Sequence, residues 1–217
     1  MNMKKTILIL LFLTSLFLVK SIKAQQLSPE VQSVYDACLE IQSAIGSGSE
    51  NGLRSANAAL KKCKTKYFGS FKPMAKDELS LMGHFVFDYE FVDSLIAGHQ
   101  VYEYAERYAH RSCIRHVTSC KGCVMMRTFA LKEESTSVYK VRAFGHQELA
   151  FVAEPQGFIT VRIHDVTNNK WYSDKTNEAE GESSRVLVFD LPDKSSVLQV
   201  EVMNLSDHDI SFVVISK

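Results

Sequence analysis

Residues 157–164, with the sequence GFITVRIH, alternate apolar and polar side chains. Ile159, Val161 and Ile163 occupy every second position, and polar side chains lie between them. Successive side chains of a strand point to opposite faces of a sheet, so this period of two predicts a strand with one buried face and one solvated face. The same pattern returns at 197–203. Together the two segments predict an antiparallel sheet that covers a core on one side.

The C-terminal part of the chain contains further short segments of this kind, and no helical pattern separates them. They are 124–131, 138–144, 148–153, 158–164, 170–173, 185–191, 197–203 and 210–215. Turn-forming sequences such as EPQG at 154–157 and LPDK at 191–194 lie between them. Many short strands at close spacing favour an antiparallel, jelly-roll-like β-sandwich over a parallel sheet.

Residues 28–67 show helical spacing instead. The two apolar stripes are Val31, Val34, Tyr35, Cys38, Ile41 and Ile45, then Leu53, Ala56, Leu60, Cys63 and Tyr67. Ser28 is placed to cap the first helix, Pro29 suits its first position, and the glycine–serine run at 46–49 ends it. We therefore expect a helical hairpin within residues 25–76 and an α+β fold.

The region between hairpin and sandwich is mixed. Residues 79–87 alternate as a strand does, 88–96 favour a short helix, and 101–110 favour another. A continuous strand over 85–92 is the competing interpretation of the middle of this region. The sandwich domain is accordingly assigned to 77–217, with a helical insertion around 89–110.

The last 60 or so residues, with 157–163, 184–189, 200–206 and 212–215 as the characteristic segments, resemble secreted bacterial β-sandwich accessory domains of the pre-peptidase C-terminal kind. The resemblance consists of the strand rhythm and an Asn-x-Ser sequence at Asn204. It implies an exported module, usually non-catalytic, and it carries over no functional residues.

The first 24 residues have the pattern of a secretory signal peptide. Two lysines precede an uncharged block at 6–19, and Ala24 closes a small-residue cleavage sequence. The block is shorter than the roughly 20 apolar residues of a membrane span, so we expect no transmembrane segment after cleavage. The protein is predicted to be exported to the periplasm, the cell surface or the medium.

Cleavage would leave a weakly acidic chain. The 25 basic residues fall to 21 against 25 acidic ones, because four lysines lie in the leader. Binding of DNA or RNA depends on clustered Lys and Arg that neutralise phosphates, and this balance offers no such excess. Nucleic acid is therefore excluded as an expected partner.

The chain has 5 cysteines, and they are its most informative reactive side chains. Cys38 and Cys63 fall on the apolar stripes of the two predicted helices, so an antiparallel hairpin would bring them face to face. We expect them to form a disulfide, because an oxidising compartment favours bridges over buried free thiols.

The remaining cysteines cluster with a histidine as Cys113, His116, Cys120 and Cys123. Two of the three cysteines are expected to form a second bridge. Four such donors also suit tetrahedral zinc, and the Cys-x-x-Cys spacing of 120–123 would suit a redox dithiol. Export argues against a zinc site, and the absence of a βαβ pattern argues against a thioredoxin-like site.

The polar stretch 165–182 is the best candidate for a ligand-binding loop. Its oxygen donors include Asp165, Asn169 and Asp174, which suit calcium, although their spacing matches no EF-hand. Beside them lie Trp171, the single tryptophan, and Tyr172. An exposed tryptophan would offer a stacking platform for a glycan, whereas a half-buried one would be an ordinary strand aromatic.

These patterns favour an exported, non-catalytic binding or cell-envelope-associated module with a glycan or another exported protein as its partner. No cofactor is predicted, with zinc and calcium as the alternatives named above. The rival hypothesis is an enzyme, or a redox or metal protein, that uses the Cys113/His116/Cys120/Cys123 cluster. The sequence contains no Gly-x-Ser-x-Gly, Walker or dinucleotide-binding glycine motif.

Overall fold

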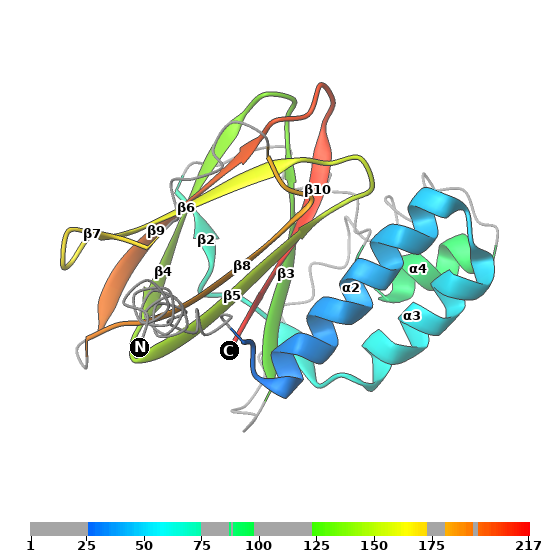
Figure 1. Cartoon of the computed structure of the whole chain (residues 1–217), viewed down its shortest axis with the longest axis horizontal. Coiled ribbons are helices and arrows are strands. Elements are labelled where there is room, and N and C mark those ends of the chain that lie inside the picture. The colour runs from blue at the N-terminus through cyan, green and yellow to red at the C-terminus, as the bar shows by residue number, and fades with distance from the viewer. Residues whose placement is uncertain (1–25, 75–86, 88, 98–122, 173–180, 193–194) are drawn as a thin grey trace, which may run out of the picture.

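The protein folds into three layers (Figure 1), seen in a computed structural model that describes residues 26–74, 87, 89–97, 123–172, 181–192 and 195–217. Helices form one outer layer, and two sheets form the other two. The elements are α2 Pro29–Ser47, α3 Glu50–Lys62, β1 Thr65–Tyr67, β2 Lys72–Pro73, α4 Tyr89–Ile96, β3 Val124–Leu131, β4 Thr136–Ala143, β5 His146–Ala153, β6 Ile159–Asp165, β7 Lys170–Trp171, β8 Ser184–Asp190, β9 Ser196–Asn204 and β10 Ile210–Ser216.

The strand order is that of a jelly roll. Sheet A has the order β1-β3-β10-β5-β8, and sheet B has the order β2-β4-β9-β6-β7. Strands from opposite ends of the sandwich sequence pair with each other: β3 with β10, β4 with β9, β5 with β8 and β6 with β7. All four pairs are antiparallel, so the chain behaves as one long hairpin rolled into two sheets. The predicted jelly-roll-like sandwich is confirmed.

An aromatic cluster fills the space between the sheets. Phe212, on the central strand β10, has its ring centroid 5.5 Å from that of Phe129, 6.0 Å from that of Tyr139 and 6.5 Å from that of Phe151. Aliphatic side chains from β6 and β9 close the cluster from sheet B. These are the inward positions of the period-two pattern, which is why the alternation predicted the buried face correctly.

The helices cover the other face of sheet A. The stripe of α2, including Val34 and Ile41, is fully buried against sheet residues such as Ala150, Val213 and Ile215. Strand β10 therefore buries both of its faces, one toward sheet B and one toward the helices. Both predicted helices are confirmed, and their apolar sides are used inside the protein.

The helix ends differ partly from expectation. Ser49 caps α3 as predicted, because its hydroxyl accepts the amide of Gly52 at 3.2 Å. Ser28 makes no side-chain cap bond to α2; its amide and hydroxyl both donate to the buried carboxylate of Glu148, at 3.0 and 2.7 Å. A charged acceptor from β5 binds Ser28 more strongly than the helix end would, so Ser28 joins the start of α2 to sheet A instead.

Two short strands were missed, and both join the sandwich. The second helix ends at Lys62, and Tyr67, predicted to lie on its stripe, is in β1, which pairs in parallel with β3. Strand β2 pairs with β4. Strands of two or three residues are too short to show a period, and pairing with long strands creates them. Residues 65–73 thus pair with the sheets, although the sequence placed them in the hairpin.

The insertion is partly described. Helix α4 occupies 89–96, as the helical interpretation predicted, and the competing strand over 85–92 is wrong at 89–92. The strand expected at 79–87 and the helix expected at 101–110 lie almost wholly outside the described residues. No described helix is long and apolar enough to cross a lipid bilayer.

The bridge predicted between Cys38 and Cys63 is absent, because both residues are free cysteines. Cys38 is fully buried between α2 and sheet A. The thiol of Cys63 turns back along α3 and donates to the carbonyl of Ala59, with Sγ and O 3.4 Å apart. Burial raises the pKa of Cys38, and the neighbouring Cys63 raises it further.

Alkylation of the native protein at neutral pH should therefore be selective. We expect Cys63, which is half-buried, to react with iodoacetamide at least about tenfold faster than Cys38, whose thiolate is disfavoured and inaccessible. Peptide mapping by mass spectrometry gives the two rates. If neither thiol reacts in denaturant without a reductant, the two are bridged in the purified protein.

Candidate binding face

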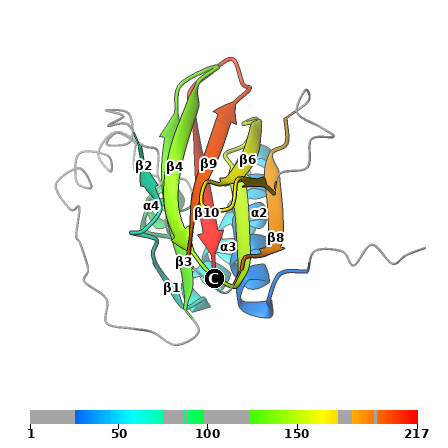
Figure 2. The same ribbon diagram turned by 90° about the vertical axis from the view of Figure 1, so that its left-hand side faces the viewer.

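The outer face of sheet B is solvent-facing, and Figure 2 views the molecule from this side, with the helices behind. Trp171 of β7 lies directly opposite His164 of β6 in the strand register. Their rings stack with centroids 4.6 Å apart and planes 17° apart. The guanidinium carbon of Arg162 lies 4.7 Å from the centre of the Trp171 ring. These contacts hold the tryptophan ring in place while 41% of the residue stays exposed.

A transverse row of side chains continues from this aromatic pair across the whole sheet. The register places Trp171, His164, Gln199, Lys140 and Lys72 directly opposite one another on β7, β6, β9, β4 and β2. Neighbouring strands lie about 4.8 Å apart, so four intervals span about 19 Å. The row presents an aromatic ring at one end and two ammonium groups at the other.

A shallow groove occupies the β2–β4 end of the row. It has a volume of 470 Å³ and is lined by Ser70, Lys72, Pro73, Met74, Lys140 and Arg142. The amide of Gln199 lies 3.5 Å from the sulfur of Met74, so the middle of the row contacts the groove wall. Glu201 of β9 lies 3.7 Å from Arg162, its register partner on β6.

Asp165 stabilises the loop that follows β6 through hydrogen bonds to its carboxylate. This residue is fully buried, and its carboxylate accepts the amides of Thr167 and Asn168 at 3.0 and 3.2 Å and the side-chain amide of Asn168 at 2.7 Å. Burial alone would raise the pKa of Asp165, but the hydrogen bonds from Asn168, Ser196 and Thr167 outweigh it and lower the pKa below its ordinary value. Asp165 thus has a structural role in the turn.

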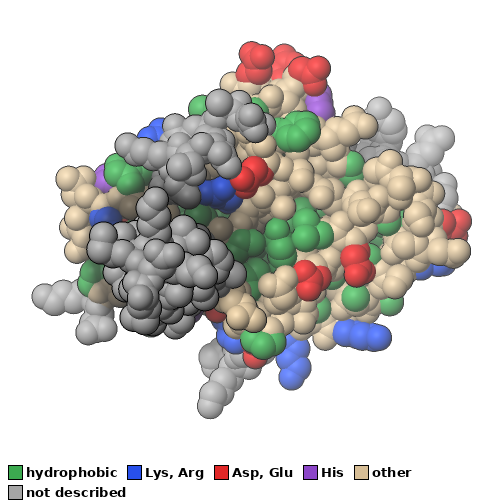
Figure 3. Space-filling view, in the orientation of Figure 1, with side chains coloured by type: hydrophobic (Ala, Val, Ile, Leu, Met, Phe, Trp, Pro, Cys, Tyr) green, Lys and Arg blue, Asp and Glu red, His purple; other side chains and the backbone are tan. Residues whose placement is uncertain are grey.

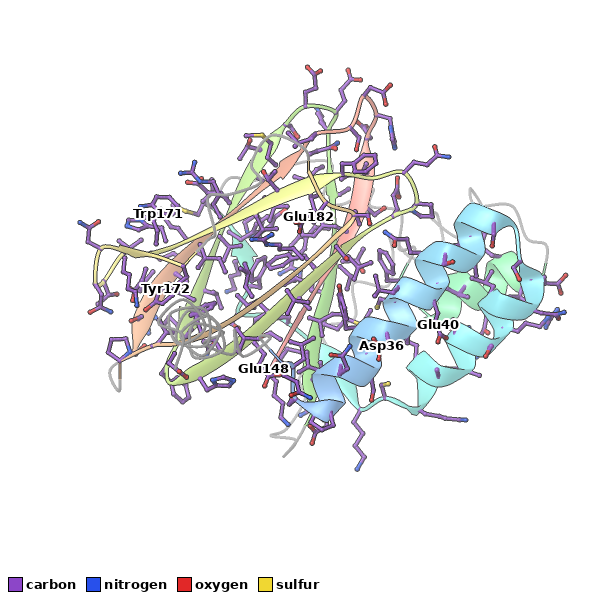
Figure 4. The ribbon with its side chains drawn as sticks, in the orientation of Figure 1. Asp36, Glu40, Glu148, Trp171, Tyr172 and Glu182 are labelled. Atoms are coloured by element: carbon purple, nitrogen blue, oxygen red, sulfur yellow. The ribbon has the colours of Figure 1, made fainter. Side chains whose placement is uncertain are left out.

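The other residues predicted for the binding loop separate. Tyr172 faces inward, stacking on Phe189 with centroids 4.4 Å apart, whereas Trp171 faces outward (Figure 4). Asn169 supports the aromatic pair, because its side-chain oxygen lies 3.2 Å from Nε2 of His164. Asp174 lies outside the described residues. The structure therefore brings Trp171 and Asn169 together at the outer face, whereas the half-buried Tyr172 packs against the core.

Of the cysteine cluster, only Cys123 is described. It is disulfide-bonded, and its partner is neither Cys38 nor Cys63, which are free. A bridged sulfur has no thiolate to offer a metal, so this favours the disulfide interpretation of the cluster. Cys113, His116 and Cys120 lie outside the described residues. Within the described ranges, no group of three or more His, Cys, Asp or Glu is placed to hold a metal ion.

Sequence reasoning missed Lys72, Lys140, Arg142 and Gln199. The alternation in 138–144 and 197–203 shows that Lys140 and Gln199 face away from the core. It does not show that strands 60 residues or so apart are neighbours, or which residue lies opposite which. The row depends on that pairing.

The protein is thus a jelly-roll β-sandwich that carries an exposed aromatic residue, Trp171, on the outer face of sheet B, where His164 and Arg162 hold its ring in place. No protein family model matches the chain, and no curated protein matches it. The resemblance of the C-terminal residues to pre-peptidase C-terminal domains is therefore not supported by a family match.

Solved structures resemble the chain only distantly. PliG from Salmonella Typhimurium, a periplasmic lysozyme inhibitor of g-type lysozyme, is 15% identical over 46% of this chain and 93% of that chain, with a TM-score of 0.30. A mutant of PliG from Escherichia coli is 14% identical with the same coverage and TM-score. The enzymatically active domain of bacteriophage CBA120 tailspike protein 4 is 13% identical over 43% of this chain and 17% of that chain, with a TM-score of 0.28. Likenesses of this strength carry no argument about function.

Proposed function

We propose that this protein is an exported, non-catalytic glycan-binding module whose binding face is the outer surface of sheet B. The observation that carries the proposal is the Trp171 ring, which is exposed on a flat sheet and held by His164 and Arg162. The apolar face of a sugar ring stacks on such a surface, and the polar side chains beside it suit sugar hydroxyls. The signal-peptide pattern of residues 1–24 supports export.

The packing of Trp171 favours binding over a merely structural role. A structural aromatic would be covered to a greater extent, as the next residue, Tyr172, is partly covered by Phe189. A ring already fixed by stacking and cation–π contacts loses little conformational entropy when a ligand settles on it. The face is therefore preorganised for a rigid, flat ligand.

Binding is tested with a panel of soluble polysaccharides, both neutral ones such as xylan and dextran and acidic ones such as polygalacturonate and alginate. Because the chain has 1 tryptophan, any change in its emission on titration reports the surroundings of Trp171 alone. We expect Trp171→Ala to weaken the binding of the responding polysaccharide about tenfold or more by calorimetry. Its free energy of unfolding should change by less than about 1 kcal/mol.

Phe158→Ala is the matched control, because Phe158 is also a large exposed aromatic, 46% exposed, but lies outside the row. It should leave binding unchanged. Equal losses in both variants, or a Trp171→Ala variant that loses about 3 to 5 kcal/mol of stability, would show that Trp171 is structural.

A further inference from the structure

The strongest concentration of charge on the binding face lies at the end of the row away from Trp171. Lys72 and Lys140 are directly opposite each other in the β2–β4 ladder, and Arg142 lies two residues further along β4. All three line the groove. Like charges directly opposite on neighbouring strands are destabilising, so this arrangement costs folding free energy unless an anion offsets the repulsion.

The protein does not supply that anion from the part that the structure describes. Arg162 and Glu201 pair with each other, whereas no described carboxylate forms a salt bridge with Lys72, Lys140 or Arg142. On the side of the molecule drawn in Figure 3, at right angles to the binding face, acidic side chains gather at the end formed by the β3–β4 and β9–β10 turns and on α2. The three cations gather in this groove although the predicted mature chain carries more acids than bases.

The groove and the tryptophan belong to one continuous row. Gln199 separates His164 from Lys140 on adjacent strands, and its amide reaches Met74 at the groove wall. A linear ligand lying across the strands would meet the aromatic ring first, then polar side chains, then the cations. Its length along the sheet would be about 19 Å, from the strand spacing.

From these observations, and resting on the proposed function, we infer that the ligand is an anionic linear polysaccharide. One sugar stacks on Trp171, and a carboxylate or sulfate group further along the same chain lies in the groove of Lys72, Lys140 and Arg142. The glycan runs perpendicular to the strands. Charge complementarity selects an acidic glycan over a neutral one of the same backbone.

Lysine and proline also occur on edge strands because they block edge-to-edge pairing, and β2 is at the edge of the described sheet B. The test must separate this role from anion binding. Arg142 serves that purpose, since it lies not on the edge strand β2 but on β4, where it is paired with Val197 of β9. If the cations only prevent edge-to-edge pairing, Lys72 is needed and Arg142 is not. If the groove binds an anion, Arg142 is needed as well.

The experiment measures the affinity of the full mature chain for polygalacturonate and for dextran, by tryptophan emission and calorimetry. Lys72→Gln combined with Lys140→Gln should weaken polygalacturonate binding about tenfold, and Arg142→Gln alone should weaken it several-fold. Lys62→Gln, which removes one exposed charge at the end of α3, should have no effect. Raising the salt from about 0.1 M to about 1 M shortens the Debye length from about 10 to about 3 Å and should weaken wild-type binding more than that of the double variant.

Two results would overturn the inference while leaving the proposed function standing. One is tryptophan-dependent binding of dextran with equal or higher affinity than polygalacturonate. The other is unchanged polygalacturonate binding in both charge variants, with the double variant alone self-associating in size-exclusion chromatography, which assigns the lysines to edge protection. If no polysaccharide in the panel alters Trp171 emission or binds by calorimetry, the proposed function itself fails.

Discussion

Phe212→Ala should lower the free energy of unfolding by about 3 to 5 kcal/mol, the usual cost of emptying a buried phenylalanine site. Phe212 is completely buried, with 0% of its surface exposed, and packs against Phe129, Tyr139 and Phe151 between the two sheets. These neighbours come from β3, β4 and β5, so both sheets lose contacts at once. Aromatic rings fixed by one another cannot collapse into the space, which leaves a cavity.

The measurement is equilibrium denaturation in urea, followed by circular dichroism and tryptophan emission. Phe144→Ala is the control, because Phe144 is 71% exposed in the connection between β4 and β5 and should change stability by about 0.5 kcal/mol or less. A typical domain has only about 5 to 15 kcal/mol of stability in total, so Phe212→Ala should shift the midpoint strongly. Similar midpoints for the two variants would show that the aromatic cluster is not the core.

Asp165→Ala should cost about 2 to 4 kcal/mol, because it removes a buried, charged acceptor of three hydrogen bonds. The amides of Thr167 and Asn168 lose their partner, and the turn that brings β7 back onto β6 loses its support. Asp190→Ala removes a carboxylate that is 84% exposed and should have little effect. Equal stabilities in these two variants would contradict the structural role assigned to Asp165.

The cost of Asp165→Ala should depend on pH in a defined direction. The folded protein lowers the pKa of Asp165, because the hydrogen bonds to its carboxylate outweigh burial. A lowered folded pKa contributes stability above the unfolded pKa of about 3.9, and this contribution is lost as the pH falls through the folded value. The stability gap between wild type and variant should therefore be widest near neutrality and shrink below about pH 4. A gap that stays constant from neutrality into this acidic range would rule out the carboxylate charge as its source.

The sequence was sufficient to predict the longer strands of the sandwich and, in those that alternate, the face that is buried. The period of two in 157–164 and 197–203 is imposed by the pleat, and a side chain that alternates in sequence must alternate in space. The helical stripes of α2 and α3 were likewise readable, because burial against one neighbour selects one side of a helix. The sequence also singled out Trp171 as a candidate glycan platform, with a half-buried strand aromatic as the alternative.

Only the tertiary structure decided what lies next to what. The row from Trp171 to Lys72 draws on five strands, and its members are collinear because of register between segments far apart in the chain. Strands β1 and β2 exist because β3 and β4 offer open edges, not because their residues show a period. Ser28 likewise binds Glu148 instead of capping its helix, because β5 places that carboxylate beside the start of α2. Periodicity records which side of an element is buried, whereas pairing is settled by long-range contacts that no local pattern encodes.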